Sequence, residues 1–395
     1  MGALTTVRFF AAFYVLLFHI WGGPGLAWTP RWFQTFASAG FTGVTFFFVL
    51  SGFIFVYTYA DKPLTLRSFW RARLARIYPS YLLSLLVTAP LFFNIEFLKM
   101  FPEQAWATSH MGITALLNIL MVQSWFPQTA LTWNEVNWSV SVEIFFYSLF
   151  PWLRGPISRF SKRGLWRLGV GAWVISIVVA ILYTLIAPDG PVPPNGDDHL
   201  LWIRVVTANP VARLPEFLIG LALGCWFVRG EHNRKLATPL VLAGVAAVLA
   251  GVAFRTSLPH AVQGTGLLAP AFAAIIAGLA LRPRWIKWLE HPLLVLLGEA
   301  SYVFYLQQFL GTSAGICGYD LGVMSRSHDS TGTRRRILAW GYRLLARGNR
   351  PSRSEIARPE VRAERGQERN PVRPWSVGRH GANDRSLQSW DHTRR

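Results

Sequence analysis

Long apolar segments follow one another through most of this chain, and they constrain its fold more than any other feature. A helix needs about 20 consecutive apolar residues to span a bilayer. Segments close to that length occur at residues 4–21, 38–59, 78–98, 138–154, 168–187, 210–228, 237–254, 263–281 and 292–314. Only 15% of the 395 residues are charged, whereas soluble domains carry about 25%. The sequence therefore predicts an all-α fold, a polytopic membrane bundle with about nine spans.

The distribution of basic residues predicts the orientation of this bundle, because loops rich in Lys and Arg stay on the cytoplasmic side. The basic loops are 61–76, 154–167, 229–235 and 282–287, and the loops poor in basic residues are 22–37, 99–137, 188–209 and 255–262. Both sets fall on their expected sides if the N-terminus is cytoplasmic and the apolar segment 112–127 does not span. We therefore expect 112–127 to be re-entrant or interfacial. No small-residue cleavage site follows the first apolar run, so we interpret it as a span and not a signal peptide.

The chain changes character after about Gly318. Residues 319–395 contain 17 Arg and 8 acidic residues, contribute +9 to the net charge of +19, and lack long apolar runs. Such a composition cannot bury a core, so we expect two parts: a membrane domain at 1–318 and a disordered Arg-rich tail at 319–395. The abrupt change favours a frameshift product or non-native terminus. The alternative is a genuine tail that binds anionic lipid or nucleic acid.

Two polar residues in the first apolar segment require an explanation. Arg8 and His19 are eleven residues apart in VRFFAAFYVLLFHI, which places them on one helix face and roughly 16 Å apart along the axis. Polar residues at membrane depth usually face the protein interior and serve function. A lipid-anchoring arginine and an interfacial histidine would also explain the pair.

Further polar residues recur in four apolar or flanking segments. Arg73 and Arg76 share a helix face just before a span, where they could bind an anion or only signal topology. Glu143 lies in an apolar run, with Ser139 four residues before it and Tyr147 four after it, so that all three can share a face. We interpret the dipeptide 51–52 as a site of close helix packing. Three more hydroxyls lie in the last apolar segment: Ser301, Tyr302 and Tyr305.

These segments together resemble the bacterial membrane acyltransferase family three, integral-membrane O-acyltransferases that modify sugars and related hydroxyl compounds. The resemblance covers about residues 1–316. It rests on VRFFAAFYVLLFH, GVTFFFVLSGF, RARLARIYPSY and NWSVSVEIFFYSLFP, with SYVFYL similar to a late family motif.

The resemblance implies an acyl-CoA donor, usually acetyl-CoA, used from the cytoplasmic side of the bacterial inner membrane. It implies His19 as the essential catalytic residue, either as a general base or as a transient acyl-imidazole. Glu143 would support catalysis by fixing the imidazole tautomer or stabilising an imidazolium. Arg73 and Arg76 would bind the CoA phosphates, with Arg8 as a further donor-binding residue. No metal is implied, and no zinc-ligand spacing or nucleotide-binding loop is present.

Two departures from the family pattern stand out. Gln308 occupies the position where the late motif usually has histidine, and the Arg-rich tail replaces the family's final span. We therefore expect an incomplete bundle with lowered stability.

Three functional hypotheses follow from the sequence. The first is an O-acyltransferase whose acceptor is a glycan or another small hydroxylated molecule, with the lipid bilayer as surroundings and no nucleic-acid partner. The second is a proton-coupled transporter or flippase that uses intramembrane Arg, His and Glu. The third is an inactive truncated family member. The encoding DNA, read in the alternate frame after about Gly318, would distinguish the third.

Overall fold

The protein is all-helical throughout the residues that the structure describes. This computed structural model describes residues 1–21, 29–94, 104–190, 200–230 and 233–308, and every regular element in these ranges is an α- or 3₁₀-helix. The all-α expectation is thereby confirmed. The Arg-rich tail at 319–395 and the end of the last expected span at 309–314 lie outside the described residues.

Within the described ranges, six helical stretches are long and apolar enough to cross a membrane. They are α1 (Gly2–Trp21), α2 with η1 and α3 (Arg31–Ala37, Gly40–Thr42 and Gly43–Tyr59), α4 (Leu66–Phe92), α9 (Lys162–Ile186), α10 with α11 (Ile203–Thr207 and Pro210–Val228) and η5 with α12 (Arg234–Leu236 and Ala237–Ala253). Shorter apolar stretches are η7 with α14 (Gly266–Leu268 and Ala269–Ala280) and α15 (Pro292–Leu306). The protein is therefore a multi-pass membrane protein.

Two of the nine expected segments form helices whose ends differ from the predicted ones. The segment expected at 78–98 begins earlier, because α4 starts at Leu66 and runs through Pro79 and Pro90. Membrane helices tolerate proline where neighbouring groups satisfy the freed backbone carbonyls. The segment expected at 138–154 forms α8 (Trp138–Ser158), a helix of 21 residues. The basic residues before Pro79 therefore belong to the same helix as the apolar residues after it.

The segment 112–127 is broken into short helices. Its first part forms α7 (Met111–Ile119), which has nine residues, and its last part includes η3 (Gln123–Trp125). Nine residues make a helix of about 14 Å, which is too short for a hydrocarbon core of about 30 Å. The segment does not cross the bilayer as one helix.

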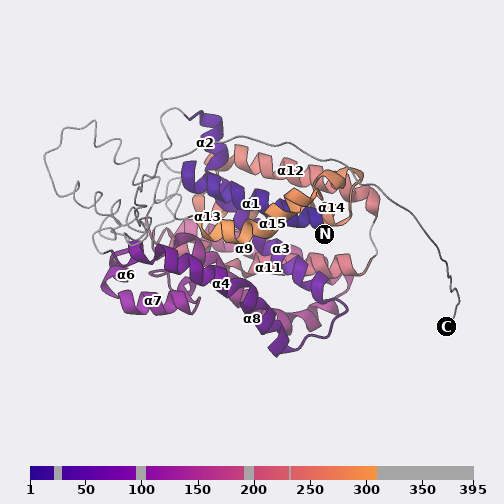
Figure 1. Cartoon of the computed structure of the whole chain (residues 1–395). Helices are drawn as coiled ribbons and strands as arrows, with labels where there is room; N and C mark the ends of the chain where they lie inside the picture. The colour runs from indigo at the N-terminus through magenta and orange to yellow at the C-terminus, as the bar shows by residue number, and fades with distance from the viewer. Residues whose placement is uncertain (22–28, 95–103, 191–199, 231–232, 309–395) are drawn as a thin grey trace, which may run out of the picture. The chain divides into compact units, whose positions relative to one another are not determined.

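Helix α3 lies at the centre of the bundle, where α1, α8, α11 and α14 pack against it (Figure 1). Of its apolar window, 78% is buried inside the protein, against 22% for α9 and 22% for α12. The outward faces of α9 and α12 carry exposed leucine, isoleucine and valine side chains that match lipid tails. The apolar surface is therefore divided between an inner packed helix and outer lipid-facing helices.

Two glycines bring α3 and α11 into backbone contact. A Cβ added to Gly220 would lie 2.1 Å from the carbonyl oxygen of Val49, and one added to Gly52 would lie 2.3 Å from that of Phe217. Small residues at such positions allow the close packing that drives helix association in membranes. Gly52 therefore has the packing role that its sequence context predicts.

We expect Gly220→Ala to lower the free energy of unfolding by about 1–3 kcal/mol, because the new methyl group forces the two backbones apart. Unfolding would be followed in detergent against Gly171→Ala. Gly171 is a helical glycine of α9, and a Cβ added there would meet no neighbouring atom within 4 Å, so its substitution should be neutral or slightly stabilising. Equal losses of stability in the two variants would contradict the proposed backbone contact.

Candidate functional site

A cavity of about 110 Å³ lies between α1, α3, α4, α8 and α15. It gathers polar side chains from segments that are far apart in the sequence. Its polar lining consists of Arg8, Ser51, Arg73, Arg76, Ser139, Glu143, Tyr147, Ser301, Tyr302 and Tyr305. Four of the five residues selected from the sequence therefore meet around one space.

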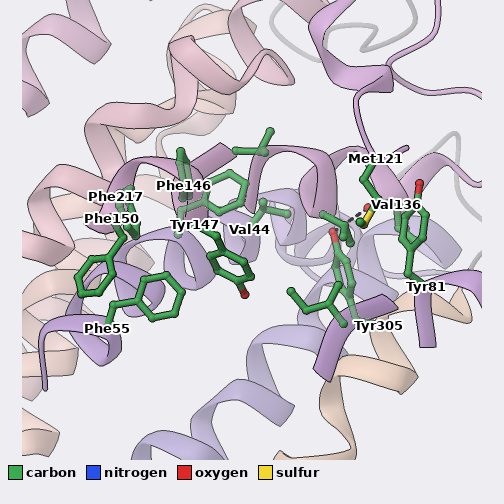
Figure 2. Packing of buried hydrophobic residues seen from close by; sticks show 14 of the residues in the cluster. Val44, Phe55, Tyr81, Met121, Val136, Phe146, Tyr147, Phe150, Phe217 and Tyr305 are labelled. Atoms are coloured by element: carbon green, nitrogen blue, oxygen red, sulfur yellow. Dashed lines mark hydrogen bonds between the residues drawn. The ribbon is translucent and has the colours of Figure 1, made fainter. Parts of the chain in front are cut away.

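The cavity is elongated along α3. Its lining on this helix extends from Val44 to Phe55, a distance of roughly 16 Å at the α-helical rise. Phe55, whose ring contacts those of Phe150 and Phe217, lies at one end of this lining, and Tyr305 lies towards the other (Figure 2). A site of this shape suits an extended ligand better than a compact one.

The three arginines of the cavity differ in their surroundings. Arg73 lies over the rings of Phe55, Tyr59 and Phe69 at 5.2, 5.9 and 5.8 Å, and its Nη2 is 3.4 Å from the Tyr59 hydroxyl. In the part of the chain that the structure describes, no hydrogen bond or ion pair engages the guanidinium groups of Arg8 and Arg76. The cavity therefore holds cationic donors that remain available to an anionic ligand.

Glu143 is the acidic residue of the cavity lining. Its Oε1 accepts a hydrogen bond of 3.1 Å from the Ser51 hydroxyl, and the carboxylate interacts electrostatically with Arg8 and Tyr147. Ser139, Glu143 and Tyr147 all line the cavity, so the shared face predicted from their spacing is confirmed. Ser51 does more than the packing predicted for it, because it also orients this carboxylate.

His19 lies outside the cavity lining, near the end of α1. Its Nδ1 donates a hydrogen bond of 2.9 Å to the carbonyl of Val15, and its ring contacts Phe18. With the proton on Nδ1, Nε2 of the neutral ring keeps its lone pair. A Cβ on Gly43, next to Val44 at one end of the cavity, would contact Val15, so His19 lies about one helical turn beyond that end.

The predicted pairing of Glu143 with His19 is not formed. Glu143 faces Arg8 and Ser51, and His19 lies three helical turns farther along α1 than Arg8. The sequence places Arg8 and His19 on one helix but cannot say which of them a distant carboxylate will meet.

A buried charged cluster behind the cavity wall was not identified from the sequence. Arg213 and Glu216 of α11 are 2% and 1% exposed and form an ion pair at 2.9 Å. Thr45 donates to Glu216 Oε1 at 2.9 Å, and Arg213 also donates to the Gly264 carbonyl. The guanidinium lies 5.3 Å from the ring of Phe48, which lines the cavity. Two opposite charges at i and i+3 in the apolar segment 210–228 were the available signal.

The late-motif residues have separate partners. Gln308 is buried and its Nε2 donates to the carbonyl of Ala12 at 2.8 Å, which ties the end of α15 to α1. Ser301 donates to the carbonyl of Gly298, and the Tyr305 hydroxyl pairs with Ser139 at 2.9 Å. Gln308, which stands where the late motif usually has histidine, thus makes a structural contact between two helices that line the cavity.

Comparison with known proteins identifies the domain that contains this cavity. A family described as an acyltransferase domain matches residues 1–314. Acyltransferase MdmB of Streptomyces mycarofaciens is 28% identical over 335 residues, which cover 82% of this chain and 82% of the relative. O-acetyltransferase OatA of Staphylococcus aureus is 25% identical over 336 residues, or 78% of this chain and 50% of OatA. No solved structure matches the chain.

We expect Arg213→Met to cost about 3–5 kcal/mol of unfolding free energy, because it leaves Glu216 as an uncompensated buried charge. The double variant Arg213→Met/Glu216→Met should recover most of this loss, since it removes both charges together. Unfolding of both variants would be measured in the same detergent. A double variant less stable than either single variant would show that the pair does not act as a unit.

Proposed function

The chain belongs to the acyltransferase 3 family, and from this we propose that it transfers an acyl group, usually acetyl, from acyl-CoA to a hydroxyl group of its acceptor. The observation that carries the proposal is the convergence of Arg8, Arg73 and Arg76 on one elongated cavity inside a membrane bundle. The relatives named above are an acyltransferase and an O-acetyltransferase. Their names support acyl transfer as the reaction class.

Arg73 and Arg76 are proposed to bind the phosphates of the donor, with Arg8 as a further donor-binding residue. Guanidinium groups form charge-assisted, often bidentate hydrogen bonds with phosphate oxygens. All three arginines line the cavity; Arg76 of α4 is exposed, whereas Arg73 of α4 and Arg8 of α1 are partly exposed. The exposure of Arg76 supports entry of the donor from the side of α4.

We place this entrance on the cytoplasmic side of the bacterial inner membrane, where acyl-CoA is available. The positive-inside rule supports the assignment, because residues 61–76, which include the start of α4, are rich in Lys and Arg. In the same scheme the N-terminus is cytoplasmic and nine helices span the membrane, with α8, α14 and α15 added to the six long stretches. The segment 112–127 is then re-entrant or interfacial, and residues 319–395 form a separate tail.

His19 is proposed as the catalytic residue. A neutral imidazole whose Nδ1–H is held by Val15 offers Nε2 as the basic atom. As a general base it would take the proton of the acceptor hydroxyl while the hydroxyl oxygen bonds to the acyl carbon. The carbon–sulfur bond then breaks and the proton passes to the CoA sulfur. As a nucleophile it would carry the acyl group first, with the same overall balance.

Glu143 is proposed to support activity as the carboxylate of the cavity. It is held by Ser51 and faces Arg8, so it can orient that guanidinium for a ligand and offset its charge. The acceptor class that fits the proposal is a glycan or another small hydroxylated compound.

Turnover of radiolabelled acetyl-CoA by the full chain in lipid tests the reaction. We expect His19→Ala to lower the rate by about 100-fold or more, because general-base or nucleophilic assistance is lost. The folded fraction of each protein would be checked by its thermal transition. A His19→Ala variant that keeps the wild-type rate would refute the assignment of His19.

Donor binding is tested with a matched pair of arginines on α4. Arg76→Gln should raise the KM for acetyl-CoA by about tenfold or more, because a charge-assisted phosphate contact is lost. Arg71 is exposed on the same helix and lies outside the cavity lining, so Arg71→Gln should leave the KM nearly unchanged. Equal effects would indicate general electrostatic attraction in place of a defined site.

A further inference from the structure

The hydroxyl of Tyr302 is a buried hydrogen-bonding group that the proposed reaction does not yet use. Tyr302 belongs to α15 and lines the cavity. Its hydroxyl oxygen is buried, and among the described residues it has no hydrogen-bond partner. A buried hydroxyl of this kind costs free energy unless a partner is supplied. A ligand in the cavity is the partner that its position makes available.

Close packing between α15 and α1 places Tyr302 beside Arg8. A Cβ on Gly298 would lie 2.0 Å from the carbonyl oxygen of Thr5, so only glycine allows this approach.

Farther along α15, the ring of Phe304 contacts that of Phe9, and the Gln308 side chain donates to the carbonyl of Ala12. The two helices therefore run alongside each other in the same direction. Tyr302, one turn after Gly298, lies level with Arg8.

Tyr302 lies between the two ends of the cavity. Arg73 marks one end, next to Phe55, and Val44 with Tyr305 mark the other. Tyr302 interacts electrostatically with groups on both sides, including Arg76 and Tyr305, and with Glu143. A ligand whose phosphates begin at Arg73 must pass Tyr302 to reach the end near His19.

We propose that Tyr302 donates a hydrogen bond to an amide carbonyl of the pantetheine arm of acyl-CoA. This inference rests on the proposed function. The pantetheine arm joins the phosphates to the thioester and carries two amide groups, so it is the part of the donor that occupies the middle of an elongated site. The arrangement directs the thioester towards the end of the cavity nearest His19. It also explains why Arg73 and His19 lie towards opposite ends of the cavity.

Tyr305 provides a matched control on the same helix. It lies three residues after Tyr302 and also lines the cavity. Its hydroxyl already has two partners. Ser139 lies at 2.9 Å, and the carbonyl of Val136, which Figure 2 shows beside Tyr305, lies at 3.4 Å. Removal of this hydroxyl removes contacts within the protein, whereas removal of the Tyr302 hydroxyl removes a donor that only a ligand uses.

The test compares two probes, CoA and pantetheine; pantetheine keeps both amide groups of the arm but lacks the whole 3′-phospho-ADP portion, adenosine and phosphates together. Binding of each probe to the full chain in lipid nanodiscs would be measured by calorimetry for wild type, Tyr302→Phe, Tyr305→Phe and Arg76→Gln. We expect Tyr302→Phe to weaken both probes by a similar factor of roughly five to ten. Arg76→Gln should weaken CoA alone, and Tyr305→Phe should change neither affinity.

Each other outcome has a defined meaning. If Tyr302→Phe weakens CoA but not pantetheine, the hydroxyl contacts the 3′-phospho-ADP portion and not the arm, and the proposal is wrong. If it weakens neither probe, or if Tyr305→Phe weakens both equally, the hydroxyl has no specific role in binding the arm. A wild-type chain that binds neither probe would instead refute the CoA-dependent function, which separates the two failures.

Discussion

The backbone contact between α3 and α11 is the constraint on which the rest of the structure depends. Gly52 and Gly220 let the two helices approach until the carbonyl of one meets the Cα of the other. In a bilayer, association must come from such packing, since lipid tails are as apolar as the helices themselves. With one face held against α11, α3 turns Ser51 and Phe55 towards α4, α8 and α15. The cavity is the space that this fixed helix leaves between its neighbours.

The bundle contains two kinds of intramembrane charge, those that pair within the protein and those that face the cavity. Arg213 and Glu216 neutralise each other within one helix and satisfy further donors and acceptors of neighbouring segments. Arg8 and Arg76 instead face a cavity with a single carboxylate among its lining residues. An ion pair within the protein supports the fold, whereas an excess of guanidinium groups in a cavity favours an anionic ligand. Charge at membrane depth therefore indicates a candidate binding site here where the opposite charges within the protein do not balance.

Much of the site could be predicted because its residues are exceptional in their surroundings. Arg8 and Glu143 stand out in apolar segments, and the spacing of Ser139, Glu143 and Tyr147 defined one helix face that the structure retains. Tyr302 was only one of several hydroxyls in its segment, and nothing local distinguished it from Tyr305. What separates them is whether another helix supplies a partner, and that depends on packing between α15, α8 and α1. The predicted pairing of Glu143 with His19 was wrong for the same reason, since it depended on the axial position of α1 relative to α8.

The sequence by itself determined that this chain is a multi-pass helical membrane protein and identified its family. Apolar length, loop charge and the order of the polar segments are local properties, and the bilayer leaves helices as the simplest way to satisfy the backbone. Only the tertiary structure decided which polar residues share a cavity, which of them are already paired, and how far His19 lies from the arginines. Those relations depend on interhelical contacts at single glycines and on the axial position of each helix relative to its neighbours. A shift of one helical turn along the axis moves a side chain by about 5.4 Å. No pattern within one segment records a displacement of that size.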